Sequence, residues 1–167
     1  IEIMIPAGTF LGVALSVGFI FFRETTDQKI RSASDVLIIP GAKVAGVLPD
    51  VHEDPAGLEI AELAVMHSSE GIFAESCRQS WAGVNRPLQK SAHQSLMVLA
   101  VAPEAGATTI IGNYAVSAYS SGSRVVVVDC NFRRPNLAAM FDVEDAAIGV
   151  ADLITGTVEL DDVVQHT

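Results

Sequence analysis

Apolar and polar positions follow different patterns in successive parts of the chain. Residues 3–22 carry no charged side chain. Two shorter apolar runs come later, Leu96–Ala102 and the consecutive valines at 125–128. These runs are short and unalternated, which predicts buried strands, whereas the three- and four-residue spacing of apolar side chains over 58–84 and 108–118 predicts helices. The order strand, helix, strand predicts an α/β domain, a partial P-loop-type fold with a parallel sheet flanked by helices.

The uncharged run at 3–22 is long enough to cross a bilayer. A helix rises 1.5 Å per residue, so this run spans roughly 30 Å, the thickness of the hydrocarbon core. A secretory signal peptide, the competing interpretation, needs basic residues before its apolar core, whereas Glu2 precedes this one. We therefore predict a transmembrane helix over 1–22. Arg23, Lys29 and Arg31 then place the residues after Phe22 in the cytoplasm.

The remaining chain divides into two predicted parts. Residues 23–57 form a juxtamembrane segment with a helix over 24–34, a short strand at 43–49 and a surface loop at 50–57. Residues 58–167 form a truncated P-loop domain. The chain begins at Ile1 and not at Met, so we expect it to be a fragment. Its formal net charge of −10 argues against nucleic acid as a partner.

The segment Pro103–Thr109 has the layout of a phosphate-binding loop. A predicted strand leads into a turn containing Gly106, and Thr108 and Thr109 open a helix whose free N–H groups would face an anion. The full pattern requires a lysine after the glycine, and this chain has Ala107 there. Glu104 adds a negative charge to the same turn. An ordinary strand-to-helix turn capped by threonine is the alternative interpretation.

Asp129 follows the second predicted strand, with Asn131 close behind. Ligands bind at the carboxyl edge of parallel sheets, where an aspartate can hold a Mg²⁺-bound water or orient a nucleophile. The alternative is an aspartate that only caps the end of the strand.

Three segments carry a resemblance to a known family: Pro103–Thr109, Val128–Pro135 and Gly149–Gly156. They resemble the bacterial tyrosine kinases of the exopolysaccharide chain-length (polysaccharide co-polymerase) type, which belong to the deviant-Walker P-loop ATPases. The family's Val-Asp-x-Asp-x-Arg-x-Pro motif is matched by Val128-Asp-Cys-Asn-Phe-Arg-Arg-Pro135. The resemblance implies a protein of the bacterial inner membrane that acts with the polysaccharide polymerase and export machinery.

The resemblance also implies a nucleotide site for ATP or ADP with Mg²⁺. Thr108 and Asp129 would hold the metal, and Asp129 would be the catalytic residue if the protein is active. The nucleotide-binding residues would be Pro103, Gly106, Ala107, Thr108, Thr109 and Asn131. Because Ala107 replaces the lysine, we expect weak or lost binding and a pseudokinase-like regulatory domain.

Glu75 and Arg78 match the first half of the family's Glu-x-x-Arg-x-x-Arg motif, which mediates assembly of a ring-shaped homo-oligomer. Trp81 stands where the second arginine should be. An exposed ion pair between residues three apart on a helix explains the same pattern without any assembly.

Three further functions stay open at this point. The chain could belong to an active tyrosine autokinase in which another residue or subunit replaces the lysine. It could be a non-catalytic membrane adaptor. It could also be related to the partition and septum-site ATPases, which share the deviant loop and usually lack a membrane span at the amino terminus.

Overall fold

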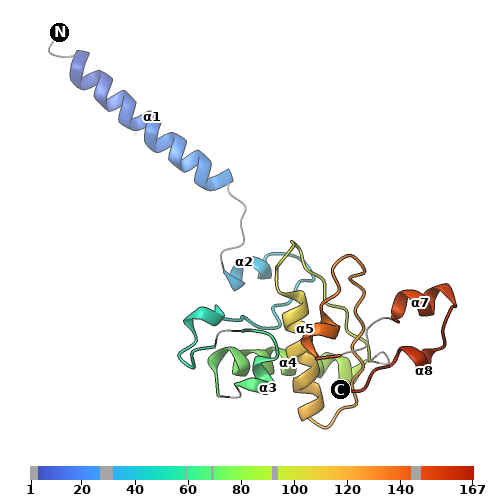
Figure 1. The fold of residues 1–167 in the computed structure, drawn as a ribbon. Helices are drawn as coiled ribbons and strands as arrows, with labels where there is room; N and C mark the ends of the chain where they lie inside the picture. The colour runs from blue at the N-terminus through green and yellow to red at the C-terminus, as the bar shows by residue number, and fades with distance from the viewer. Residues whose placement is uncertain (1–3, 27–31, 59, 69, 92–93, 144–147) are drawn as a thin grey trace. The chain divides into compact units, whose positions relative to one another are not determined.

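A computed structural model describes residues 4–26, 32–58, 60–68, 70–91, 94–143 and 148–167. The chain divides into two units, 1–44 and 45–167. Figure 1 shows the elements, which are helices α1 (Met4–Thr26), α2 (Ala33–Leu37), α3 (Ala64–His67), α4 (Ile72–Lys90), α5 (Ala107–Ser120), α6 (Leu137–Met140), α7 (Val150–Thr155) and α8 (Leu160–Val163), and the 3₁₀ turn η1 (Val51–Glu53).

The predicted parallel sheet is wrong, because none of the residues that the structure describes forms a β-strand. The segments 43–49, 96–102 and 125–128 are irregular, with no ladder of backbone hydrogen bonds. Strands of a parallel sheet are covered by helices on both faces, whereas the side chains of Leu99 and Val126 are 75% and 76% exposed. These segments have the apolar, β-branched residues typical of strands, but their backbone is not paired with a neighbouring segment.

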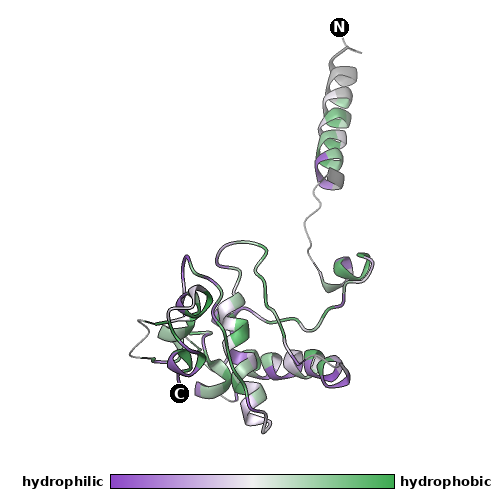
Figure 2. Cartoon of the chain, turned by 90° about the vertical axis from the view of Figure 1, so that its right-hand side faces the viewer, coloured by the Kyte–Doolittle hydropathy of each residue, from purple (hydrophilic) through white to green (hydrophobic). Residues whose placement is uncertain are grey.

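The predicted transmembrane helix over 1–22 is also corrected. The chain forms the long helix α1 there, and Figure 2 shows apolar residues along much of its length. Even so, no helix within the described ranges is both long and apolar enough to cross a bilayer. Arg23 and Glu24 lie near the end of the helix. The prediction of an inner-membrane protein with cytoplasmic residues after Phe22 is therefore not supported.

The predicted helix over 24–34 is not one continuous helix, because the range contains the end of α1 and the start of α2. Helix α1 continues to Thr26, and α2 begins at Ala33 after the N-cap Ser32. Residues 27–31, which include Lys29 and Arg31, lie outside the described residues.

The core of the second unit lies where α3, α4 and α5 pack against one another. The apolar spacing over 58–84 predicts helices, and the structure has α3 and α4 there, with Gly71 as the N-cap of α4. Phe73, Ala74 and Cys77 lie on one face of α4 and are buried against α3. Burial raises the pKa of the Cys77 thiol to about 11.

Asp54 fixes the start of α4 from a distant loop. Its Oδ2 accepts a hydrogen bond from the Phe73 N–H at 2.7 Å, and its Oδ1 accepts one from the Ala56 N–H at 2.9 Å. These two bonds hold the pKa of the Asp54 carboxyl below its usual value. A Cβ on Gly71 would come within 3.0 Å of Asp54 Oδ2, so the glycine lets the carboxylate approach the helix end.

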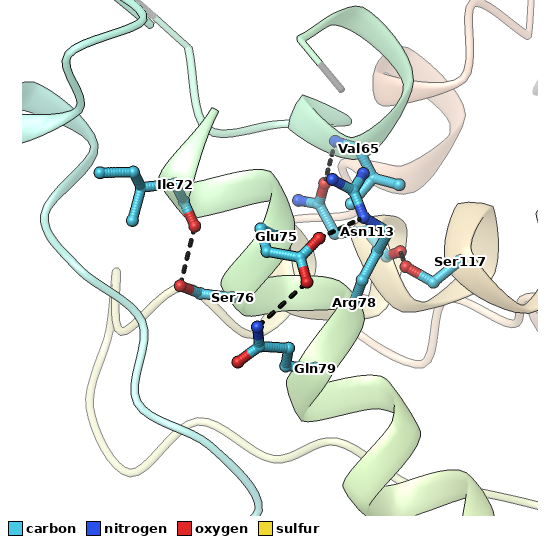
Figure 3. A network of polar contacts seen from close by, with 8 residues as sticks. All are labelled: Val65, Ile72, Glu75, Ser76, Arg78, Gln79, Asn113 and Ser117. Atoms are coloured by element: carbon cyan, nitrogen blue, oxygen red, sulfur yellow. Dashed lines mark hydrogen bonds and ion pairs between the residues drawn. The ribbon is translucent and has the colours of Figure 1, made fainter. Parts of the chain in front are cut away.

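Asn113 joins α5 to α3 and is completely buried. Its Oδ1 accepts a hydrogen bond from the Val65 N–H at 2.9 Å, which Figure 3 shows. Its Nδ2 donates to the carbonyl oxygens of Ala61 and Thr109, both at 2.9 Å. A single amide side chain therefore satisfies three backbone groups where α5 meets α3, which is how a buried polar residue becomes stabilising.

Candidate functional site

The candidate site is the turn that leads into α5. Gly106 is the N-cap, with φ 79°, and Glu104 also has a positive φ, 61°. Glycine adopts this left-handed conformation easily, whereas for Glu104 it is uncommon. No side chain in the described part of the chain caps this helix. The N–H groups of Ala107, Thr108 and Thr109 therefore belong to a first turn that has no acceptors within the helix.

The charge of this turn does not suit a polyphosphate. Residues 103–109 include no lysine or arginine, and their one charged side chain is Glu104. Thr108 and Thr109 are half-buried at the helix start, and Pro103 is exposed. The helix terminus thus offers backbone N–H groups and a partial positive charge, with a carboxylate beside them.

Asp129 is used as the cap of a short helix. Its Oδ2 accepts hydrogen bonds from the N–H groups of Asn136 and Leu137, at 2.9 and 3.1 Å, at the start of α6. Its Oδ1 accepts one from the Asn131 N–H at 2.9 Å. A carboxylate offers about four acceptor positions, so three bonds leave little capacity for a metal or a water.

The structure does not join the two halves of the predicted nucleotide site. Within the described part of the chain, no hydrogen bond or ion pair links Asp129 or Asn131 to residues 103–109. Asn131 Oδ1 accepts instead from the Arg134 N–H, at 3.3 Å. The described residues also contain no group of three His, Cys, Asp or Glu side chains that could hold a metal ion. The roles predicted for these residues toward ATP and Mg²⁺ stay predictions.

Glu75 and Arg78 lie on the exposed side of α4. Glu75 Oε2 accepts from Arg78 Nε at 3.0 Å, and Glu75 Oε1 accepts from Gln79 Nε2 at 3.0 Å (Figure 3). The bonds from Gln79 and Arg78 hold the pKa of Glu75 below its usual value. The Glu75 side chain is 53% exposed, so its carboxylate is arranged by its neighbours and still open to a partner.

Trp81 replaces the second arginine of that motif and points toward the interior. Its ring centroid lies 5.6 Å from that of Tyr114 on α5, and its buried Nε1 has no hydrogen-bond partner among the residues that the structure describes. The Tyr114 hydroxyl forms its hydrogen bond with Ser80 instead. This position therefore contributes to the contact between α4 and α5 and not to a charged surface.

Comparison with known proteins places the chain near bacterial tyrosine kinases. No model of a protein family matches it. The chain is 28% identical over 105 residues to the tyrosine-protein kinase Ptk of Acinetobacter johnsonii, an alignment that covers 63% of this chain and 14% of that protein. It is 21% identical over 175 aligned residues to a putative tyrosine-protein kinase in the cps region of Klebsiella pneumoniae, covering 98% of this chain and 24% of that protein. The chain is thus a distant relative of tyrosine kinases and spans a quarter of their length or less.

Sequence patterns did not reveal the residues that organise the region around α5. The sequence patterns assigned no role to Asn113 and placed Asp54 in a surface loop. For Asn113 a signal was present: an amide within the apolar face of the helix at 108–118 needs partners when it is buried. For Asp54 no comparable signal was present, because the Phe73 N–H that it binds lies nineteen residues later in the chain.

Proposed function

We propose that this chain is part of a tyrosine-kinase-like protein that regulates exopolysaccharide production and that its nucleotide site no longer transfers phosphate. The observation that carries the proposal is the turn before α5, an open helix terminus with Ala107 and Glu104 where a phosphate site needs a cation. The names of the two relatives support the kinase ancestry, and one of them is named for a cps region.

The magnitude of the defect follows from the missing charge. A hydrogen bond to a charged group contributes about 1.5–3 kcal/mol, which corresponds to roughly ten- to a hundredfold in affinity. Repulsion between Glu104 and a triphosphate adds to this loss. Helix N–H groups alone would then hold nucleotide weakly. The positive charge that positions the phosphoryl group and stabilises its transfer would be absent.

Where nucleotide does bind, the N–H groups of Gly106, Ala107, Thr108 and Thr109 are the groups that would contact phosphate. Mg²⁺ would supply charge neutralisation, with the Thr108 hydroxyl as its ligand. Asp129 would have to give up part of its role at the start of α6 to reach the same ion. This competition is a second reason to expect an inactive site.

Calorimetry with Mg-ATP tests the proposal on the full chain. We expect little binding by the unchanged protein and a gain of roughly tenfold or more in Ala107→Lys with Glu104→Gln. Ala139→Lys, which adds the same lysine to an exposed position on α6, is the control and should leave binding unchanged. Micromolar affinity in the unchanged protein would contradict the proposal, and phosphotyrosine that Asp129→Ala abolishes would favour an active autokinase.

A second function, assembly with further copies of the chain, is favoured by the arrangement on α4. Glu75 is exposed and held in one orientation by Arg78 and Gln79, which lowers the conformational entropy lost on binding. Sedimentation of Glu75→Arg should show smaller species than the unchanged chain, whereas Glu62→Arg, another exposed position, should not. Identical sedimentation of all three proteins would contradict a role of Glu75 in assembly, and its contact with Arg78 would then be only a local ion pair.

A further inference from the structure

The apolar segment 96–102 is covered on one side only. Three alternate side chains are open to solvent, with exposed fractions of 78%, 75% and 102% for Met97, Leu99 and Val101. Between them, Leu96 is 37% exposed and Val98 is partly buried. Among the large side chains, exposure therefore alternates with a period of two residues, which is the period of an extended chain. The segment presents three open apolar side chains on a single face.

The backbone of this segment is open to a partner as well. Among the residues that the structure describes, none forms a backbone hydrogen bond with residues 96–101. Residues 91–103 contain no Asp, Glu, Lys or Arg. Extended, uncharged and apolar segments with unpaired N–H and C=O groups are the sites where another strand adds, and proteins usually protect such segments with charged residues or prolines.

The order of side chains in the segment favours an identical segment as the partner. When two copies of 96–102 run antiparallel with Leu99 opposite its own counterpart, Met97 lies opposite Val101 on the same face. The open side chains of the two copies then form three apolar cross-strand pairs, and the contact is the same from both sides. On the other face each large side chain lies opposite a small one, and these pairs are Leu96 with Ala102 and Val98 with Ala100.

The other open apolar segment, 125–128, does not match itself in this way. Its most exposed side chains are those of Val126 and Val128, and it is enclosed by Arg124 and Asp129. Any antiparallel register that brings the open valines of two copies to one face also places a charged side chain opposite a valine. Charged residues at the ends of an apolar segment oppose pairing, so this segment serves as a control.

We propose that two copies of the chain associate through antiparallel pairing of residues 96–102. Two copies with a net charge of −10 repel each other, so an uncharged contact is the least costly place for them to meet. The pairing is between chains and differs from the parallel sheet predicted within one chain. Seven residues a side is small against the 20–30 or so of a stable interface, so the dimer is weak and the segment stays open in dilute solution.

Disulfide cross-linking of the full chain at high concentration tests the register. Cys130→Ala is the background, because Cys130 is exposed and Cys77 is buried. Leu99→Cys places two thiols opposite each other, with Cβ atoms about 4.5–5.5 Å apart, close to disulfide geometry. Met97→Cys, on the same open face, places its two thiols roughly 14 Å apart along the strands.

Oxidation in air with copper phenanthroline should therefore give covalent dimers of Leu99→Cys and not of Met97→Cys. Mixing Met97→Cys with Val101→Cys should restore cross-linking, because these two positions lie opposite each other in the proposed register. Equal cross-linking of Leu99→Cys and Met97→Cys would mean unspecific contact and would overturn the proposal, as would its absence from both.

Sedimentation equilibrium separates this contact from the assembly proposed at Glu75. Leu99→Lys places two lysines opposite each other and should weaken dimerisation roughly tenfold or more. Val126→Lys, at an equally exposed position, is the matched control and should not change it. Circular dichroism of both variants should match the unchanged chain, because both side chains are exposed. Association that is lost in Glu75→Arg and kept in Leu99→Lys would overturn this proposal, whereas the reverse result would support it and remove the contact at α4.

Discussion

The cluster of α3, α4 and α5 and the two segments 96–102 and 125–128 all carry large apolar side chains, but their burial is opposite. Val65 and Phe73 in the cluster are 7% and 6% exposed. Leu99 and Val126 in the segments are 75% and 76% exposed. An apolar sequence therefore reports a tendency to be buried, and whether burial happens depends on the surfaces that the rest of the chain supplies.

Polar groups account for much of the difference. In the cluster, Asp54 supplies acceptors for the start of α4, and Asn113 satisfies backbone groups of 61–65 and 109. Packing can then exclude water without leaving donors or acceptors unpaired. The two segments have no such groups and, within the described residues, no pairing strand. Their backbone is left to water.

The largest expected effect tests burial directly. Phe73→Ala should lower the free energy of unfolding by about 3–5 kcal/mol, because it leaves a cavity in the core. Leu99→Ala, the matched change in an exposed segment, should alter it by no more than about 0.5 kcal/mol. Urea unfolding followed by circular dichroism measures both. A loss at Leu99 comparable to that at Phe73 would mean that residues 96–102 are packed in solution.

The second comparison concerns two asparagines. Asn113→Ala leaves the Val65 N–H and two carbonyl groups without their partner and should cost about 2–4 kcal/mol. Asn131→Ala removes an exposed amide whose one side-chain bond within the described residues is the 3.3 Å contact with the Arg134 N–H, and it should cost less than about 1 kcal/mol. Equal losses in the two variants, measured in the same urea titrations, would show that the buried amide does not organise α5.

The sequence predicted helices better than strands, for a physical reason. The apolar face of α4 repeats within one continuous segment, so its period identifies the element. A strand over 96–102 or 125–128 also needs a neighbour elsewhere in the chain, and no local pattern guarantees one. The same limit applies to α1, where an uncharged run indicated a membrane span that no described helix can make.

Of the candidate site, the sequence predicted the start of α5 but not the position of Asp129. Gly106 followed by Thr108 and Thr109 located the start of a helix within one residue, since the left-handed turn that a glycine allows is a local feature. The placement of Asp129 was not predictable in this way. Its position after an apolar run suggested a sheet edge, whereas its carboxylate binds the N–H groups of Asn136 and Leu137 seven and eight residues later.

The smallest expected effect uses the two cysteines and appears only at high pH. The buried Cys77 thiol has a pKa of about 11 against an ordinary value of 9.0, so between these values the unfolded chain loses a proton that the folded chain keeps. Stability from this group is thus complete below pH 9 and falls as pH rises, by about 2 kcal/mol at pH 11. In urea titrations the stability advantage of the unchanged chain over Cys77→Ala should shrink by that amount between pH 8 and 11. Cys130→Ala, which removes an exposed thiol, should run parallel to the unchanged chain.

At pH 8 a thiol reagent should modify Cys130 quickly and Cys77 only on unfolding, and rapid modification of both would show that the α3–α4 core opens readily.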